Sequence, residues 1–554
     1  MKIALLNPPQ IFSRYQIATG ITPPLGIAYL AAFCLSKGYQ VQLIDAPGEA
    51  PWTISTFQDD IFLRGMTIEE IIDSIDSDAE IIGISNLFSF AYPAIRKLSE
   101  ALREAFPQST IVLGGPHPTH MFEEVLEHGA ADFVIRGEGE FPILDLCRHL
   151  AGEIPIDEVR SVSYRGPDGE IVSTPTARRI RDLDQDNLPF PARHLLPMEN
   201  YIAVQEAHGP TTNRWTSMIT SRGCPYGCTF CDIRRTKWVG RSARDVVDEI
   251  ELCKKEWGIT EFHFEDDNMT IRRDRMLEIC DEIIARKLNI SWQTPNGIRA
   301  SVTDAEMLTK MKASGCVHIT LAPESGSERV VKELIQKGKD FSHDQLLDVG
   351  RTAHRLGMKV AAYFILGMPG ETPEELEETI QYGKRLARAG VDEAGFALLI
   401  PLPGTPVWDE VVKKGEQPDY LDLLIVGDLN KSASYSAFLT SDQLSDARRR
   451  AYFSFFLSRA IYHPFSFART AFNVLRSTAE TKTESYIRTF VRRQLAEPPS
   501  TNPGSIQGSY VTYSGERTVS VLLQTKANYG YSNSWLRAIT VVFGHFYKTL
   551  LRKN

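Results

Sequence analysis

The sequence predicts an α/β protein in which two regions of alternating strands and helices are followed by a mainly helical region. Three observations lead to this fold class. Over the first 150 residues, short apolar runs alternate with helical periods, and the alternation returns with longer helices after Trp215. Beyond residue 410 the alternation stops and helical spacing remains. Alternating strands and helices are typical of βαβ units and parallel sheets.

Composition restricts the class of protein. The chain has 554 residues, 43% of them hydrophobic, and 61 basic against 70 acidic residues, a net charge of −9. A balance of this sign gives no support to nucleic acid as a partner. Eight cysteines at mostly isolated positions favour a reducing compartment. The start breaks too early for a signal peptide, and no apolar run reaches 18 residues, so we expect a cytoplasmic protein without a spanning helix.

These patterns divide the chain into four parts: residues 1–150, a polar linker over 151–210, a second α/β region over 211–410, and a C-terminal substrate or accessory domain over 411–554. In the first part we expect strands over 2–6, 41–44, 81–85, 111–113 and 133–135, with helices between them. This order predicts a doubly wound, Rossmann-like sheet. In the linker, Asp168-Gly169 between two short apolar runs predicts a hairpin.

Ligands of such sheets bind beyond the carboxyl ends of the strands. The candidate binding residues at these ends are Asn7, Pro8 and Pro9, then Ser85 and Leu87, then Gly114, Gly115 and His117, and finally Gly137, Glu138 and Gly139. Taken singly, each glycine group is also typical of an ordinary turn. His117 and His120 could be metal ligands, but their loop-like spacing favours contact with a cofactor or a capping role.

The second α/β region contains six candidate strands, over 217–221, 261–265, 290–294, 317–322, 359–366 and 393–399. Helices separate them, and Thr372-Pro373-Glu374-Glu375 forms a capping box before one of these helices. Six βα units fit a partial (β/α)6 barrel. In barrels the chemistry lies at the carboxyl ends of the strands.

Three cysteines follow the first strand of this region in a C-x3-C-x2-C pattern: Cys224, Cys228 and Cys231. Thiolates are soft ligands that select iron–sulfur clusters, zinc or copper. Three thiolates leave one iron of a four-iron cluster without a protein ligand, so that a substrate or cofactor can bind there. Gly223 and Gly227 would let the backbone curl around the cluster, since glycine reaches φ > 0 without strain. The alternatives are a zinc knuckle, which usually needs four ligands, and a redox dithiol.

With Phe230 before its last cysteine, the motif resembles the signature of radical S-adenosylmethionine (SAM) enzymes. The resemblance implies a [4Fe–4S] cluster on the three cysteines and a SAM molecule bound at the strand ends. The SAM-binding positions that it implies are Phe230, Glu265, Asp266, Glu324, Ser325, Ile365, Gly367 and Leu399. Two positions depart from the family pattern at the adenine contact: Tyr363 replaces a glycine, and Glu371 comes one residue late.

The first part of the chain resembles the cobalamin-binding domain that precedes some radical SAM barrels. Ser85 and Leu87 match its S-x-L loop, and Gly114-Gly115 match its paired glycines, so the strand-end residues given above become cobalamin contacts by resemblance. The family's D-x-H-x-x-G motif is absent, because the matching loop begins Asn7-Pro8-Pro9-Gln10. The P-x-P-G-T-P run at 401–406 is similar to the cobalamin-dependent subgroup, and the resemblance covers residues 1–410.

The resemblance implies that SAM is cleaved to a 5′-deoxyadenosyl radical and that cobalamin delivers a methyl group to an unactivated carbon of a small molecule or peptide. The expected partner is an electron donor such as flavodoxin or ferredoxin. Three alternatives remain: a cyclisation or rearrangement with the same cofactors, a radical SAM enzyme whose first domain is vestigial, and a non-catalytic iron–sulfur or zinc module.

The remaining cysteines and the C-terminal part carry less specific signals. Five cysteines stand at apolar spacing and are expected to be buried: Cys34, Cys147, Cys253, Cys280 and Cys316. Helices are expected over 441–457, 464–475 and 484–495. The aromatic residues between 453 and 467 favour core packing, with a large apolar substrate pocket as the alternative. The basic amphipathic run over 535–553 leaves contact with a membrane surface open.

Overall fold

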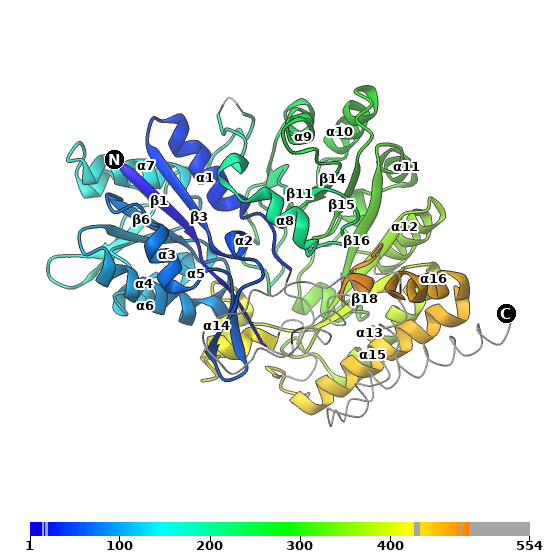
Figure 1. The fold of residues 1–554 in the computed structure, drawn as a ribbon. Helices are drawn as coiled ribbons and strands as arrows, with labels where there is room; N and C mark the ends of the chain where they lie inside the picture. The colour runs from blue at the N-terminus through cyan, green and yellow to red at the C-terminus, as the bar shows by residue number, and fades with distance from the viewer. Residues whose placement is uncertain (14–15, 17–19, 186, 426–432, 476–478, 487–554) are drawn as a thin grey trace.

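The computed structural model describes residues 1–486, apart from 14–15, 17–19, 186, 426–432 and 476–478. The N-terminal α/β region lies beside the second α/β region, and the long C-terminal helices run along the outer side of the latter (Figure 1). The predictions for 487–554, including the basic amphipathic run, lie outside the described residues. No helix in the described part of the chain is long and apolar enough to cross a membrane.

The N-terminal sheet has the doubly wound topology that the sequence predicts. Its parallel strands are β1 (Lys2–Asn7), β3 (Gln40–Asp45), β6 (Ile81–Ser85), β7 (Thr110–Gly114) and β8 (Phe133–Ile135), in the order β8-β7-β6-β1-β3. The order reverses between β1 and β6, and such a switch point is where open α/β sheets bind ligands. Ile3 and Leu5 pack in one core cluster, whereas Ala4 and Leu6 pack in another, so both faces of the sheet are covered.

Helices pack on both faces of this sheet. The cluster around Ile3 includes residues of α1 (Leu25–Ser36) and α7 (Glu140–Leu150), and the cluster around Ala4 includes residues of α3 (Ile68–Ser74), α4 (Tyr92–Ala105) and α6 (Phe122–Glu127). Shorter helices are α2 (Ala46–Glu49), α5 (Pro116–His120) and α8 (Met198–Val204).

Two strand groups are added to this unit. The predicted hairpin is confirmed as β9 (Val162–Arg165) and β10 (Ile171–Ser173), and β9 pairs antiparallel with β8, so the hairpin extends the first sheet. A separate antiparallel sheet, which the sequence did not predict, consists of β2 (Gln10–Ser13), β5 (Ile61–Arg64) and β4 (Ile54–Gln58).

The second α/β region is an open, six-stranded parallel sheet in sequential order, as expected for a partial barrel. Its strands are β11 (Trp215–Met218), β14 (Glu261–Phe264), β15 (Ser291–Thr294), β16 (Cys316–Glu324), β17 (Lys359–Leu366) and β18 (Glu393–Leu398). Its helices are α9 (Ala243–Trp257), α10 (Arg273–Ala285), α11 (Ala305–Ala313), α12 (His343–Arg355) and α13 (Pro373–Ala389). The predicted capping box at Thr372 and Glu375 is present.

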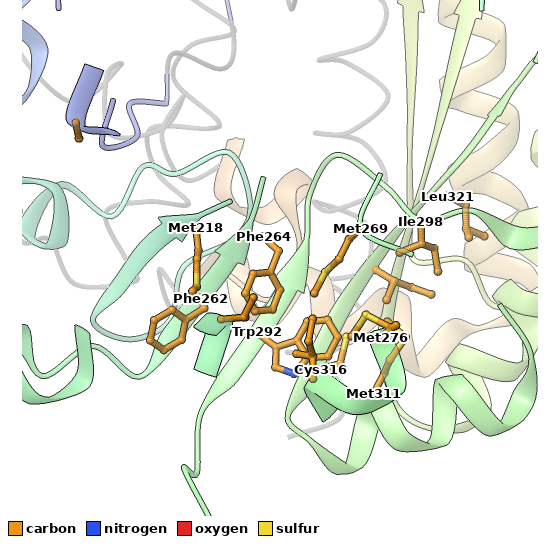
Figure 2. Close-up of a cluster of buried hydrophobic side chains, with 14 of the residues drawn as sticks. Met218, Phe262, Phe264, Met269, Met276, Trp292, Ile298, Met311, Cys316 and Leu321 are labelled. Carbon is orange, nitrogen blue, oxygen red and sulfur yellow. The ribbon is translucent and has the colours of Figure 1, made fainter. Parts of the chain in front are cut away.

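Apolar side chains fill the space between the barrel strands and their helices. Phe262, Phe264 and Trp292 project from the strands toward Met276 and Met311 on the helices (Figure 2). The five cysteines outside the motif are all buried, as predicted, and Cys316 lies in this layer. This packing fixes which strand residues face outward and, because side chains alternate along a strand, which face the barrel interior.

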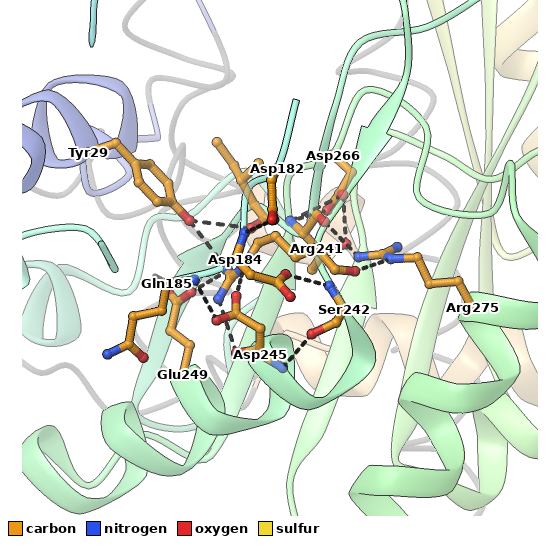
Figure 3. A network of polar contacts seen from close by, with 12 residues as sticks. Tyr29, Asp182, Asp184, Gln185, Arg241, Ser242, Asp245, Glu249, Asp266 and Arg275 are labelled. Carbon is orange, nitrogen blue, oxygen red and sulfur yellow. Dashed lines mark hydrogen bonds and ion pairs between the residues drawn. The ribbon is translucent and has the colours of Figure 1, made fainter. Parts of the chain in front are cut away.

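A buried ion-pair network joins the two α/β regions. Arg241 pairs with Asp245 at 2.6 Å and also with Glu249, which accepts from Arg193 at 2.5 Å. The Tyr29 hydroxyl of α1 lies 3.4 Å from both Arg241 Nη1 and the Ile219 carbonyl oxygen (Figure 3). Buried charges are costly unless they are paired, and the Tyr29 hydroxyl connects α1 to this paired network.

The C-terminal region is helical where it is described. It contains α14 (Pro406–Lys413), a 3₁₀ segment (Tyr420–Ile425), α15 (Ser441–Tyr462) and α16 (Pro464–Leu475). The two long helices confirm the predictions for 441–457 and 464–475. Phe455 is buried, whereas Phe453 and Phe465 are exposed, so the aromatic residues in this region do not form a single core. Residues 479–486 then return to the barrel, where Lys482 and Thr483 contact Glu393 of β18.

Candidate active site

The three cysteines of the motif lie on one loop beyond the carboxyl end of β11. The loop connects two short antiparallel strands, β12 (Ser221–Arg222) and β13 (Val239–Gly240). Cys224 N donates to Thr236 Oγ1 at 2.9 Å, and Thr236 N donates back to the Cys224 carbonyl oxygen at 2.9 Å. Thr229 N donates to the Ile335 carbonyl oxygen at 2.9 Å. The loop is therefore tied to itself and to a neighbouring element of the barrel.

The two glycines of this loop have different roles. Gly223 has φ +87°, and a Cβ there would lie 2.5 Å from the Lys237 carbonyl oxygen, so only glycine fits. The same expectation for Gly227 is wrong, because its φ is not in the left-handed region. A Cβ at Gly227 would instead meet the Arg235 guanidinium at 3.3 Å.

The donor set of the loop fits a cluster with one open iron. All three thiols are partly buried, and burial raises the pKa of each, that of Cys231 to about 12. Arg299 opposes this effect at Cys224 and Cys228, and Lys337 does so at Cys228. Such cations favour the thiolate form that binds iron. Among the described residues, no three His, Cys, Asp or Glu side chains converge on a single-ion site.

Two consecutive acids after β14 hold the start of the cysteine loop. The buried Asp266 carboxylate accepts from Thr220 N, from Thr220 Oγ1 at 2.7 Å and from Ser221 Oγ at 2.5 Å. Arg275 binds the same stretch from the other side, through the Thr220 carbonyl oxygen at 2.6 Å (Figure 3). Asp267 accepts from Gly223 N at 2.8 Å. The Asp266 carboxylate thus serves the loop, and its role toward SAM stays a prediction.

Glu265, the first acid of this stretch, points in another direction. Its Oε2 lies 3.0 Å from His208 Nδ1, and its Oε1 is buried with no partner in the described structure. Burial alone would raise the pKa of Glu265, but His208, His263 and Lys482 together hold it below its usual value. An ionised carboxylate with a free oxygen can receive a donor such as an amino group.

An apolar cluster beside the cysteines brings together three of the predicted SAM-binding side chains. Phe230, Ile365 and Leu399 pack together with Cys228 and Met368. They come from the cysteine loop and from the ends of β17 and β18. Sequence reasoning placed Phe230 in the cysteine motif and the other two at strand ends, and the structure brings the three together.

The end of β16 carries two further predicted positions. Glu324 adopts φ +63°, and its carboxylate pairs with Lys337, which also donates to the Ala322 carbonyl oxygen. Ser325 is buried, and its Oγ lies 2.9 Å from Thr379 Oγ1. A non-glycine residue in the left-handed region is uncommon and often marks a functional site.

The loop after β17 is held by the glutamate that departs from the family spacing. Glu371 Oε2 accepts from Gly367 N at 2.6 Å and from Met368 N at 3.1 Å. Gly367 has φ +89° and lies against Leu444 of α15. Burial raises the pKa of Glu371 to about 7, and its Oε1 has no partner among the described residues.

Two cations near the cysteines were missed in the sequence. Arg299 stacks over the Tyr226 ring at 3.7 Å and pairs with Asp340. It follows β15, so a search of that strand end would have found it. Lys337 reaches Glu324 from a loop after a short π-helical turn, which no sequence pattern marks.

The predicted cobalamin residues gather at the carboxyl edge of the N-terminal sheet. Gly115 has φ +112°, and a Cβ there would lie 2.5 Å from the Asn86 carbonyl oxygen, whereas a Cβ at Gly114 would meet nothing within 4 Å. Leu87, after Ser85, is 58% exposed although it is apolar. Open backbone at Gly114 and exposed apolar surface at Leu87 fit a large planar cofactor.

Most of the other predicted cobalamin residues at this edge make contacts within the protein. Asn7 donates to Asp45 at 2.8 Å, and Pro8 and Pro9 help to line a pocket of about 280 Å³. Gly137 N donates to Thr119 Oγ1 at 2.9 Å, and Gly139 is the N-cap of α7. Glu138 binds Arg179 at 2.7 Å and accepts from Ile180 N at 3.0 Å, so its carboxylate anchors the following polar segment.

His117 is buried at this edge in an aromatic setting. Its ring lies 4.6 Å from that of Tyr92 and 5.1 Å from that of Tyr420, and its Nδ1 is 3.1 Å from Ser89 Oγ. Burial lowers the pKa of His117 to about 3, so the ring is a neutral imidazole. Its Nε2 has no partner within the described residues.

The two strand-end sites face each other across one close contact. A Cβ at Gly404, in the P-x-P-G-T-P run, would lie 2.2 Å from Nδ1 of His120 in α5. Glycine at 404 therefore lets the loop after β18 touch the loop after β7. Tyr420 adds a second contact, because its hydroxyl donates to Glu124 at 2.5 Å.

Comparisons with known proteins agree with this arrangement. Residues 218–383 match the radical SAM superfamily, and residues 17–146 match the B12 binding domain. Cytidylyl-2-hydroxyethylphosphonate methyltransferase of Streptomyces wedmorensis is 32% identical over 446 residues, which cover 75% of this chain and 82% of that protein. This chain belongs to the cobalamin-dependent radical SAM enzymes.

Other relatives of this cobalamin-dependent radical SAM enzyme define the range of the group. The anaerobic magnesium-protoporphyrin IX monomethyl ester cyclase of Rubrivivax gelatinosus is 29% identical, over 84% of this chain and 79% of that protein. The cobalamin-dependent SAM radical enzyme OxsB, solved with aqua-cobalamin and SAM, matches with a TM-score of 0.64 at 17% identity, over 100% of this chain and 80% of that chain.

The family membership settles the broad function. The chain is an enzyme, its cofactors are a [4Fe–4S] cluster, SAM and cobalamin, and methyl transfer is the activity that its relatives support. The residues described above fit these groups by donor type and by open backbone. Their individual roles remain predictions.

Proposed function

We propose that this enzyme transfers a methyl group to an unactivated carbon of a small substrate that binds where the two α/β regions meet. The observation that supports the proposal is the contact of Gly404 with His120, since it brings the cobalamin edge of one sheet next to the strand-end loops of the other. The methyltransferase relative, at 32% identity, supports transfer rather than cyclisation. We also propose the division into 1–150, 151–210, 211–410 and 411–554 as the working domain limits.

We assign the following binding roles to residues of the chain. When bound, the cluster and SAM supply a carbon radical, and cobalamin supplies a methyl group. Cys224, Cys228 and Cys231 would hold the cluster. Glu265 would receive the SAM amino group, and Glu324 with Ser325 would contact the ribose and carboxylate. Phe230, Ile365, Gly367 and Leu399 would enclose the adenine side and exclude water.

On the cobalamin side, two features of the strand ends would determine how the cofactor lies. Gly114 leaves room at the backbone, and Leu87 would offer it an apolar contact. The neutral ring of His117 would donate or accept one hydrogen bond through Nε2. The P-x-P-G-T-P loop would then close the space between the two cofactors.

The reaction needs an external electron donor, for which flavodoxin or ferredoxin is our first choice. The first compound to test as a substrate is cytidylyl-2-hydroxyethylphosphonate, which the name of the methyltransferase relative gives. The cyclase relatives make magnesium-protoporphyrin IX monomethyl ester the second.

The test is anaerobic reconstitution of the full chain with iron, sulfide, cobalamin and SAM that carries a deuterated methyl group. We expect 5′-deoxyadenosine and a product that carries the label. Cys231→Ala should abolish both, and Cys253→Ala, in the buried core, is the matched control. An unlabelled, altered product would instead indicate a cyclase or rearrangement. Absence of 5′-deoxyadenosine would refute radical chemistry.

A further inference from the structure

The interior face of the barrel sheet is polar. Phe262, Phe264 and Trp292 face the helices, so the alternate residues of β14 and β15 face inward. Residues that pair with these across the sheet face the same side, so the register identifies the inward residues of the other strands. The polar residues of this face include Ser217, Glu261, His263, Glu265, Gln293, His318, Thr320 and Glu393. Trp215, Ala361 and Tyr363 share the face with them, and Lys359 lies on it at the amino end of β17. Parallel barrels usually fill this space with branched apolar side chains, so the polarity calls for a separate explanation.

Many of these inward groups lack a hydrogen-bond partner. The buried atoms without one in the described structure include Ser217 Oγ, His263 Nδ1, Glu265 Oε1, Gln293 Oε1, His318 Nδ1 and Thr320 Oγ1. Native proteins leave few buried polar atoms unpaired, and each such atom indicates water, an ion or a ligand. Apart from Glu265 Oε1, which we assign above to the SAM amino group, five such atoms on one face have no partner among the described residues and are open to a further hydrogen-bonding ligand.

A lysine from the C-terminal region enters the same space. Lys482 is only 3% exposed, and its Nζ lies 4.9 Å from the centre of the Tyr363 ring. Within the described residues it makes no ion pair or side-chain hydrogen bond, although Glu393 and Glu265 lie near enough to act on its charge. Burial lowers the pKa of Lys482 to about 8 in spite of these two carboxylates.

The position of Lys482 is fixed by its backbone. Glu393 Oε1 accepts from Lys482 N at 3.2 Å, and Glu393 Oε2 accepts from Thr483 N at 2.7 Å and Thr483 Oγ1 at 3.0 Å. His318 Nε2 lies 3.0 Å from Glu393 Oε1. The Glu393 carboxylate is thus fully used as an anchor, and the ammonium group that it positions remains free.

We propose that the polar part of the substrate reaches from the junction of the two α/β regions into the barrel interior, where Lys482 Nζ donates a hydrogen bond to one of its oxygens. Thr320 and Ser217 would supply further hydroxyl contacts, and Tyr363 would form the apolar wall. The inference rests on the proposed function and narrows its substrate to small, oxygen-rich molecules. A tetrapyrrole, which is large and mostly apolar, would not satisfy this face.

The test compares wild type, Lys482→Met and Lys359→Met, all as full chains reconstituted anaerobically. Lys359 is the matched control, because it starts β17 and has two carboxylate partners at 3.5 Å, Asp392 and Glu480. Cytidylyl-2-hydroxyethylphosphonate is the probe, its affinity is measured by calorimetry with SAM present, and melting temperature and 5′-deoxyadenosine formation are recorded in parallel.

We expect Lys482→Met to bind the probe at least about tenfold more weakly, the loss typical of one charge-assisted hydrogen bond. Its melting temperature should not fall, because it removes a buried charge without a partner, whereas Lys359→Met should melt lower and keep probe affinity. Lys482→Arg should recover part of the binding.

Three results would overturn the inference. One is unchanged probe affinity in Lys482→Met together with a lower melting temperature, which would make the lysine structural. A second is binding of magnesium-protoporphyrin IX monomethyl ester, but not of the probe, by wild type. The third is a crystal structure with the probe present in which only ordered water fills the interior. Failure of wild type to form 5′-deoxyadenosine would instead refute the proposed function itself.

Discussion

Asp266 is the residue on which the geometry of the cysteine loop depends most. Its carboxylate accepts from Thr220 N, Thr220 Oγ1 and Ser221 Oγ, directly before the stretch that leads into Cys224. Arg275 fixes the Thr220 carbonyl oxygen from the opposite side. The Asp266→Asn variant keeps the size of the side chain, removes its charge and places an amide N–H₂ where an acceptor stood.

The size of the effect follows from these contacts. Hydrogen bonds to a charged group contribute about 1.5–3 kcal/mol each, so the loss of two of them costs about 3–6 kcal/mol. Asp266 is 2% exposed, so solvent does not offset the loss. Since domains are stable by only about 5–15 kcal/mol, we expect Asp266→Asn to fold but with a loosened cysteine loop.

The assay is iron and sulfide content after anaerobic reconstitution, read together with the visible absorbance of the cluster and denaturant unfolding. Asp266→Asn should lose most of its bound iron and about 3–6 kcal/mol of stability, the value of two hydrogen bonds to a charged group. Asp274→Asn is the control, because that carboxylate is exposed and, among the described residues, its ion pair is with Arg272. Wild-type iron content in Asp266→Asn would refute the reasoning, since the loop would then hold its shape without the carboxylate.

Three further predictions concern other parts of the two sites. Alanine at any of the three cluster cysteines should abolish iron binding and 5′-deoxyadenosine formation, while Cys280→Ala should preserve both; iron analysis and product chromatography would show it. Gly114→Ala and Gly115→Ala should both lower cobalamin retention on a desalting column, because a Cβ at Gly114 would take up the space left for the cofactor and a Cβ at Gly115 would lie 2.5 Å from a backbone oxygen. Burial raises the pKa of Glu371 from 4.5 to about 7. The protonated carboxyl therefore contributes fully to folding stability below pH 4.5, and this stability is lost as the pH rises to 7. Relative to Glu371→Gln, wild type should lose roughly 3 kcal/mol over this range in denaturant titrations, and a flat difference would contradict the assignment.

The sequence was sufficient for the two parallel sheets because their strands are short apolar runs between well-marked helices. All six barrel strands lie within a few residues of their predicted positions, and the hairpin at Gly169 follows from its turn residues. The sheet of β2, β5 and β4 was missed, because strands as polar as Ile54–Gln58 become recognisable only through their long-range partners.

The site was predictable to the extent that strand ends mark it. Phe230 in the cysteine loop and Ile365 and Leu399 at two strand ends meet in one cluster. The use of each side chain was not predictable: the Asp266 carboxylate turns to the loop behind it, and only the contacts show this. Lys482 stands 89 residues after Glu393 in the chain, and no local pattern could place it inside the barrel.

The placement of charge in this enzyme follows from what each region must hold. Around the cysteines the cations Arg299 and Lys337 face thiols whose ionised form is needed, and each of these cations is paired with an acid. In the barrel interior Glu393 is anchored by its hydrogen bonds, and the buried ammonium of Lys482 makes no ion pair within the described part of the chain. A paired charge contributes to the structure, whereas an unpaired buried charge costs free energy until a ligand arrives. The free group therefore marks the place where binding, rather than folding, determines the choice of residue.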